Sequence, residues 1–152
     1  MSKILLVMVL FIIVASLYFV QNFIMDIELG DVDHNGISQD ENSAIYILEQ
    51  KPSNIAIAAY AILEKPGYIV IHENNNGNFG KILGNSKLLP IGKSDNVFIG
   101  IIRQSFHGEI FFAVMYEDSG DGIFTPGVDV PFKTDFDDII FTKFRINVDA
   151  KL

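Results

Sequence analysis

The chain contains no cysteine in its 152 residues. It therefore has no disulfide, no thiolate metal site, no cysteine nucleophile and no lipid-modified cysteine. A cysteine-free domain that is exported must be stabilised by its hydrophobic core alone, or by its core together with a bound metal.

Positive charge is also scarce. Lys3 is the only lysine or arginine before Lys51, and the formal net charge of the chain is -8. Nucleic acids and anionic lipid head groups are polyanions, so an acidic surface disfavours both as partners. The same surface suits an exposed position at a cell surface and the binding of divalent cations. We therefore expect no nucleic-acid partner.

One long segment lacks charge altogether. Ile4 to Val20 is seventeen residues without a charged side chain, and as a helix it would span about 26 Å, close to the thickness of a bilayer core. Lys3 precedes it, so the positive-inside rule places the N-terminus in the cytoplasm and the rest outside. We interpret residues 1–22 as a transmembrane anchor that makes the membrane a partner.

A cleaved signal peptide is the alternative interpretation, with the small residues Val14-Ala15-Ser16 as its cleavage site. The apolar run continues past that site to Val20, which favours a retained anchor. Residues 23–43 then read as an acidic juxtamembrane linker, and residues 44–152 as an extracytoplasmic domain.

Short apolar runs separated by turn signals fill the rest of the chain and predict strands. Lys65 to Tyr68 fits a type II turn, with Gly67 supplying a positive φ, so its flanking strands should form a hairpin. Ile69–Ile71 and Ile110–Met115 are apolar on both faces, as central strands of a double layer would be. The predicted strands are Ala44–Leu48, Asn54–Leu63, Gly67–His72, Val97–Ile102, Glu109–Tyr116 and Ile139–Val148.

These strands, without a convincing amphipathic helix, predict an all-β fold. The expected architecture is an immunoglobulin-like antiparallel β-sandwich of about seven strands, preceded by one N-terminal transmembrane α-helix. A closed barrel is the alternative architecture.

The order of several short motifs resembles a known family. Between Ala44 and Val148 the chain is similar to an uncharacterised immunoglobulin-like domain of prokaryotic, notably haloarchaeal, cell-surface proteins. The resemblance implies an extracytoplasmic β-sandwich and brings no catalytic residues. The residues that carry it are Pro66 to Glu73, Gly77, Gly80, Ile82-Leu83-Gly84, Ser86, Leu89, Gly92, Asn96-Val97, Ala113 to Tyr116, Asp118, Asp121-Gly122, Phe124, Asp129 and Pro131.

The segment from Asp31 to Glu41 has the spacing of a calcium loop. Oxygen ligands at positions 1, 3 and 5 precede a glycine and a backbone carbonyl at position 7, which is what such a loop needs. Position 12 is Asn42 rather than a bidentate glutamate, so Asp40 or Glu41 would have to replace it. A solvated acidic linker is the alternative. The candidate calcium ligands are Asp31, Asp33, Asn35, Ile37, Gln39 and Glu41.

A second segment repeats the alternation more weakly. Three oxygen-bearing side chains again precede a glycine, Gly122, but a loop between two strands explains the same residues. The candidate ligands here are Glu117, Ser119, Asp121, Ile123 and Asp129.

We find no convincing enzyme motif. His72 and Glu73 suggest a zinc or hydrolase site, but no second histidine lies at ligand spacing. Ser105 and His107 have no third group to orient the base. We therefore expect no catalytic residues, and no cofactor other than calcium. The expected function is a structural or interaction module of the cell envelope, partnered by other envelope proteins or by itself; a calcium-dependent ligand-binding or adhesive module is the alternative.

Overall fold

The computed structural model describes residues 37–39 and 42–151. The predicted anchor and most of the predicted linker lie outside these residues. Among the residues that are described, no helix is long and apolar enough to cross a membrane.

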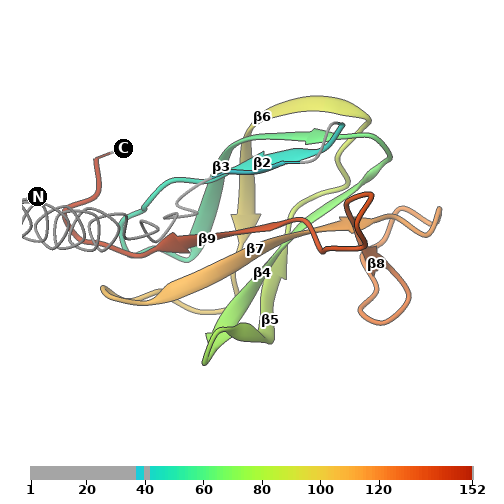
Figure 1. Cartoon of the computed structure of the whole chain (residues 1–152). Helices are drawn as coiled ribbons and strands as arrows, with labels where there is room; N and C mark the ends of the chain where they lie inside the picture. The colour runs from blue at the N-terminus through green and yellow to red at the C-terminus, as the bar shows by residue number, and fades with distance from the viewer. Residues whose placement is uncertain (1–36, 40–41, 152) are drawn as a thin grey trace, which may run out of the picture. The chain divides into compact units, whose positions relative to one another are not determined.

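Two antiparallel sheets make up the described part of the chain (Figure 1), which confirms the prediction of an all-β fold. The strand orders are β1-β2-β3-β6 in the four-stranded sheet and β5-β4-β7-β8 in the five-stranded sheet, where β9 also pairs with β7. The strands are β1 (Ile37–Gln39), β2 (Ala44–Tyr46), β3 (Ile55–Leu63), β4 (Gly67–Asn75), β5 (Asn78–Asn85), β6 (Gly92–Gly100), β7 (Ile110–Glu117), β8 (Val130–Pro131) and β9 (Phe141–Arg145).

The core lies between the two sheets. Strands β4 and β7 pair with each other at the centre of the five-stranded sheet, and both faces of each strand are largely buried, as the apolar runs predicted. Their inward side chains meet small residues of β3, so the layers can approach closely. The inward set includes Ala56, Ala58 and Ala61 opposite Ile69, Ile71, Phe111, Ala113 and Met115.

The predicted hairpin at Pro66-Gly67 is wrong. Strands β3 and β4 lie in different sheets, so the turn carries the chain from one layer to the other. Gly67 is absent from the residues with positive φ. Its lack of a side chain serves another purpose: a Cβ atom there would lie 2.1 Å from the carbonyl oxygen of Tyr116. Close backbone approach, rather than turn geometry, requires this glycine.

The sequence predicted no strand over residues 78–85, where the structure has β5, so this prediction too is wrong. The link from β4 to β5 is the two-residue turn Asn76-Gly77, whose φ angles are 52° and 89°. Two positive φ angles are typical of the type I′ turn that joins antiparallel strands, and Asn-Gly is its usual sequence. The structure also extends the sheet into the predicted linker, because Ile37–Gln39 pair with β2 as β1.

The two sheets touch at the end of β6. A Cβ atom on Gly84 of β5 would lie 1.9 Å from the carbonyl oxygen of Gly100. Just beyond this contact, the N–H of Ile102 donates to the carbonyl of Leu83 across a distance of 2.8 Å. The sheets are thus joined along one side, yet they remain two sheets rather than the closed barrel considered as the alternative.

This contact makes a stability prediction. We expect Gly84→Ala to lower the free energy of unfolding by about 2 kcal/mol or more, because the added methyl group overlaps backbone that cannot rotate away. Gly100→Ala is the matched control, since a Cβ there meets nothing within 4 Å, and we expect a change within about 0.5 kcal/mol. Urea denaturation of the full-length chain measures both; equal effects of the two substitutions would contradict this account.

Candidate functional site

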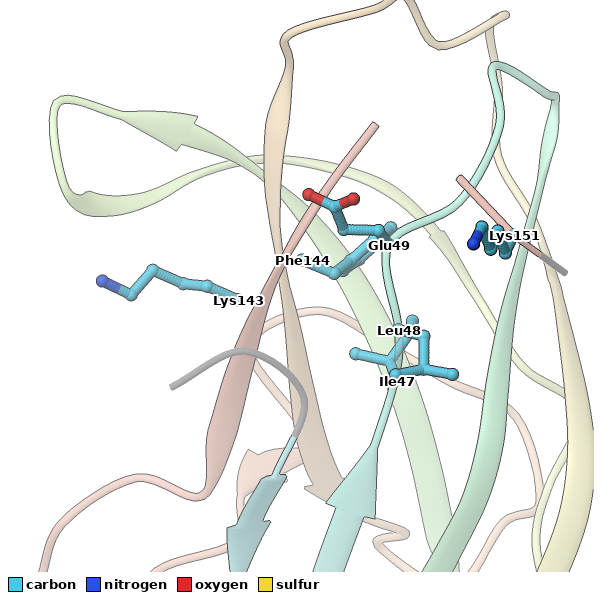
Figure 2. A pocket seen from close by; sticks show the side chains of 6 residues that line it. All are labelled: Ile47, Leu48, Glu49, Lys143, Phe144 and Lys151. Atoms are coloured by element: carbon cyan, nitrogen blue, oxygen red, sulfur yellow. The ribbon is translucent and has the colours of Figure 1, made fainter. Parts of the chain in front are cut away.

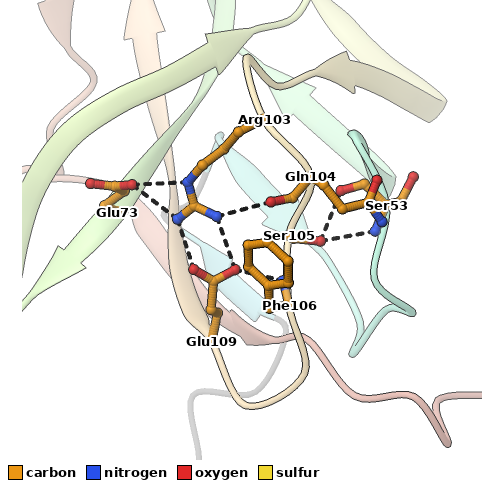
Figure 3. Close-up of polar contacts among 7 residues, drawn as sticks. All are labelled: Ser53, Glu73, Arg103, Gln104, Ser105, Phe106 and Glu109. Carbon is orange, nitrogen blue, oxygen red and sulfur yellow. Dashed lines mark hydrogen bonds and ion pairs between the residues drawn. The ribbon is translucent and has the colours of Figure 1, made fainter.

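Arg103 forms the densest polar cluster of the described chain (Figure 3). Its Nε and Nη2 donate to Glu73 Oε1 at 3.2 and 2.9 Å, and its Nη2 and Nη1 donate to the two carboxylate oxygens of Glu109 at 2.7 and 3.1 Å. Nη1 also donates to the carbonyl of Gln104 at 3.0 Å. These contacts use all five N–H bonds of the guanidinium group. We call Arg103, Glu73 and Glu109 the arginine clasp.

The clasp fastens the loop that follows β6. Glu109 Oε2 accepts the backbone N–H of Phe106 at 2.7 Å, which ties the two ends of the loop together. Ser105 bonds reciprocally with Ser53: its Oγ donates to the Ser53 carbonyl at 2.8 Å and accepts the Ser53 N–H at 2.9 Å. The loop is therefore pinned to both layers of the domain, because Glu73 belongs to β4 and Ser53 precedes β3.

The electrostatics of the clasp follow from its partners. Burial alone would raise the pKa of Glu109, but hydrogen bonds from Arg103 and from the Phe106 N–H, together with the charge of Arg103, outweigh it and lower that pKa. The hydrogen bonds from Arg103 to Glu109 and Glu73 raise the pKa of Arg103. Since every donor is already engaged, the clasp holds the loop in place and offers no N–H group to a ligand.

The clasp separates the two residues that suggested a zinc or hydrolase site. Successive strand residues point to opposite faces of a sheet, so Glu73 turns to Arg103 while His72 faces the other way. His72 is 5 % exposed. The structure does not bring their functional groups together.

His72 sits among aromatic rings on the outer face of the five-stranded sheet. Its Nδ1 lies 3.1 Å from the carbonyl oxygen of Gly80, and its Nε2 lies 3.3 Å from the hydroxyl of Tyr116. A carbonyl only accepts, so Nδ1 carries the proton and Nε2 accepts from Tyr116. The rings of Phe79 and Tyr116 flank the imidazole, with centroids at 5.7 and 6.0 Å. The neutral form of His72 satisfies both bonds.

The weaker calcium candidates belong to a loop that its own aspartates hold in shape. Asp129 accepts the backbone N–H groups of Ser119 and Thr125 at 2.9 and 2.7 Å, one on each carboxylate oxygen. The bond from Thr125 is the largest of the effects that lower the pKa of Asp129. Asp121 accepts the N–H of Ile123 at 2.9 Å. Calcium would have to share or displace these donors.

The remaining candidates are dispersed. Glu117 pairs with Lys65 at 3.0 Å rather than turning toward Asp129, and the side chain of Ile123 is exposed. The structure thus brings Ser119 and Asp129 together and leaves Glu117 apart. Within the described residues, no group of three or more His, Asp or Glu side chains is arranged to hold a metal.

Tyr68 and Asp118 also help to hold the loop that contains the weaker calcium candidates. The Tyr68 hydroxyl donates to Asp118 Oδ1 at 3.1 Å, and the Gly122 N–H donates to the same oxygen. Burial, followed by this hydrogen bond to Asp118, raises the pKa of Tyr68 to about 12. The tyrosine therefore stays neutral and donating across the physiological range.

Most of the stronger calcium candidate lies outside the described residues. Asp31, Asp33, Asn35 and Glu41 are not among them, whereas Ile37 and Gln39 lie in the backbone of β1. Within this candidate loop, the structure therefore describes only residues 37–39.

Sequence reasoning missed a hollow at the far end of β9 (Figure 2). Ile47, Leu48 and Phe144 give it an apolar floor, and Glu49, Lys143 and Lys151 complete its lining. Figure 2 shows the two lysines on either side of Ile47 and Leu48. Phe144 is buried and Lys143 is exposed in β9, but nothing in the predicted strand Ile139–Val148 indicated that residues 47–49 would lie beside them.

His72 makes a pH prediction. Burial lowers its pKa, so between that value and the unfolded value near 6.5 the unfolded chain binds more protons. We expect stability to fall as the pH drops through about 6.5. Glu109 and Asp129 have lowered pKa values, but these change the free energy of unfolding only when the pH falls to the ordinary pKa range of carboxylates or below it. Urea unfolding of the full-length chain at several pH values between 7 and 5 measures this dependence.

The matched variants are His72→Phe and His107→Gln. Removing the buried histidine should flatten the dependence between pH 7 and 5, whereas removing His107, whose side chain is exposed, should leave it intact. An unchanged slope in His72→Phe would show that another group binds the proton.

Comparison with known proteins assigns the domain to a family. No curated protein and no solved structure matches the chain. The family model described as "Domain of unknown function (DUF7282)" matches residues 47–146, which run from the end of β2 to just past β9. The matched residues include both the arginine clasp and the loop that Asp121 and Asp129 hold in shape. The chain belongs to this family, DUF7282.

Proposed function

We propose that this chain is a membrane-anchored, extracytoplasmic β-sandwich that acts as a structural or interaction module of the cell envelope, of the type found in haloarchaeal cell-surface proteins. The observation that carries this proposal is that polar and apolar side chains have different roles in the domain. Polar groups fasten the loops internally, while large apolar side chains stand exposed on the same rigid frame.

The polar side chains described above are directed inward, at the backbone. The clasp, the Ser53–Ser105 pair and Asp129 each accept or donate bonds that hold a loop. Large apolar groups remain on the surface of the ordered domain, where they favour association. Those more than 60 % exposed are Ile91, Phe98, Ile102, Phe106, Ile123 and Phe136.

The strand order supports an immunoglobulin-like assignment. If β2 is taken as strand A, then β2-β3-β6 correspond to A-B-E and β5-β4-β7-β9 to C′-C-F-G. This is the pairing of an immunoglobulin-like sandwich with C′ in place of D. Such sandwiches are common in cell-surface domains, where they carry interactions through loops and faces.

The location rests on the leader. Ile4–Val20 is long enough to cross a bilayer, and Lys3 lies on its N-terminal side. The absence of cysteine makes this testable, because a single introduced cysteine is the only thiol in the chain.

Labelling of intact cells with a membrane-impermeant maleimide tests the location. We expect the full-length Ile91→Cys chain to be labelled in intact cells and the Ser2→Cys chain to be labelled only after lysis. Both should resist extraction from membranes by alkaline carbonate. An Ile91→Cys chain that reacts only after lysis would refute the proposed orientation, and loss of the Ser2→Cys label from the mature protein would indicate a cleaved leader.

Calcium-dependent binding or adhesion is the second candidate function. The observation that favours it is the position of β1: Ile37, whose carbonyl would be the ligand at position 7 of the loop, is held by pairing with Tyr46 of β2. The sheet therefore fixes the backbone in the second half of the Asp31–Glu41 loop.

A stability measurement tests this candidate. If the loop binds with the dissociation constant of about 10⁻⁴ to 10⁻³ M that is usual for extracellular modules, about 10 mM calcium should stabilise the full-length chain by about 1.4–2.7 kcal/mol. Asp31→Asn with Asp33→Asn should abolish the effect, and Asp121→Asn tests the second loop separately. Equal stability in calcium and in chelator would eliminate this function.

A further inference from the structure

A rigid turn between β8 and β9 presents one aromatic side chain to solvent. Phe132 and Ile140 anchor the base of the turn in the core, at 3 % and 1 % exposure. Their backbones bond to β7, since Phe132 N–H donates to the Met115 carbonyl and Met115 N–H donates to the Ile140 carbonyl. We call residues 132–140 the Phe136 turn.

The tip of the turn is closed by its own polar groups. The Thr134 N–H donates to the Asp138 carbonyl at 2.8 Å, and the Asp137 N–H donates to the Thr134 carbonyl at 2.9 Å. Thr134 Oγ1 accepts the N–H of Phe136, and Lys133 pairs with Asp137 at 2.6 Å. The backbone at the tip is therefore held in a defined conformation before any partner arrives.

That side chain is Phe136, which is 89 % exposed, the highest value among the large apolar residues of the described chain. A single exposed apolar residue is ordinary on a protein surface. A phenylalanine at the tip of a turn pinned this firmly is presented on a preorganised backbone, so little backbone freedom is lost when the ring is buried. Three aspartates and one lysine surround it in residues 133–138.

The hollow at the other end of β9 has the opposite character. Its floor is apolar, and its lining carries two lysines against one glutamate. That glutamate, Glu49, already accepts a hydrogen bond from Asn147 at 3.2 Å. Ile47 and Phe144 are 0 % and 2 % exposed, so Leu48, at 48 %, supplies the apolar surface that the floor has left to bury.

We propose that the Phe136 turn of one copy docks in this hollow of the next copy, so that the chain associates head to tail. The apolar tip matches the apolar floor, and the acidic flanks match Lys143 and Lys151. The Phe136 turn ends at Ile140, and Lys143 of the hollow lies three residues further along the extended strand, about 10 Å away, so a copy cannot fill its own hollow. Such a contact is heterologous and builds rows rather than closed pairs.

This inference deepens the proposed function and rests on it, because it names a second copy as a partner of the envelope module. A basic peptide of another protein, or the membrane surface, would place Phe136 against something other than Leu48. A residue-specific cross-link between two copies therefore separates these occupants.

The test uses the full-length chain in the membranes of the cells that express it. Two differently tagged copies are coexpressed, one with Lys133→Cys and the other with Glu49→Cys, so that Phe136 and Leu48 are both retained, and mild oxidant is added. We expect a mixed disulfide dimer that carries both tags, at about ten-fold higher yield than the control pair of Ile91→Cys with Glu49→Cys. Both Lys133 and Ile91 are exposed, so unspecific collision would favour neither.

A charge exchange tests the recognition itself. Lys143→Glu with Lys151→Glu in the Glu49→Cys copy should reduce the cross-link several-fold, and Asp135→Lys with Asp138→Lys in the Lys133→Cys copy should restore it. All four side chains are exposed, so folding should persist. A cross-link no stronger than the control, or one indifferent to the charge exchange, would overturn the proposal. If the Ile91→Cys chain is nevertheless labelled on intact cells, head-to-tail docking fails while the envelope location stands.

Discussion

The arrangement of the whole domain depends on one place where two backbones touch without side chains. Gly84 of β5 lies so close to the carbonyl of Gly100 that a Cβ atom would overlap it. That approach allows the Ile102 N–H to reach Leu83 and turns the chain across the end of the sandwich. Arg103 is the next residue, so the same contact delivers its guanidinium group to Glu73 on β4.

The arginine clasp is a consequence of this contact rather than an independent feature. Its groups are exposed by about a third, at which depth an ion pair contributes little unless its geometry is fixed. Here the geometry is fixed from both sides, by the glycine contact and by the Ser53–Ser105 pair. Five hydrogen bonds donated by this one preorganised side chain then hold a loop that buries little apolar surface of its own.

The sequence was sufficient to predict the central strands but not which strands pair. The sequence predicts the burial of Ile69–Ile71 and Ile110–Met115 because both faces of these strands are apolar. A strand that is apolar on both faces is stable mainly where both faces are covered. Pro66-Gly67 gave a turn without saying whether it joins two strands or two layers. Strand β5 was not predicted for a different reason. Asn, Gly and Lys are poor strand formers, but pairing with β4 after the Asn76-Gly77 turn overrides that preference. The clasp could not be predicted, because Arg103 and Glu73 are thirty residues apart.

The residues that carry the family resemblance and those of the proposed contact have different structural roles. Ser86, Asp118 and Asp129 bond to backbone N–H groups or to Tyr68, and so maintain the frame. Phe136 and Leu48 maintain nothing in the frame that exposes them. Under the proposed function, association falls to such exposed apolar side chains, because the polar groups named here already have partners within the domain.

This separation determines how association would respond to salt. The charges that flank Phe136 and the hollow are exposed and are screened within about 3 Å at 1 M ionic strength. The burial of an aromatic ring is not screened, since it depends on removing apolar surface from water. Charge would therefore steer encounter and set the direction of docking, while Phe136 would set how long the contact lasts. The net charge of -8 makes copies of the chain repel one another on average, and an orientation that brings lysines against acidic side chains reduces this repulsion. Head-to-tail contact through Lys143 and Lys151 is one such orientation, and it leaves the remaining acidic surface facing solvent.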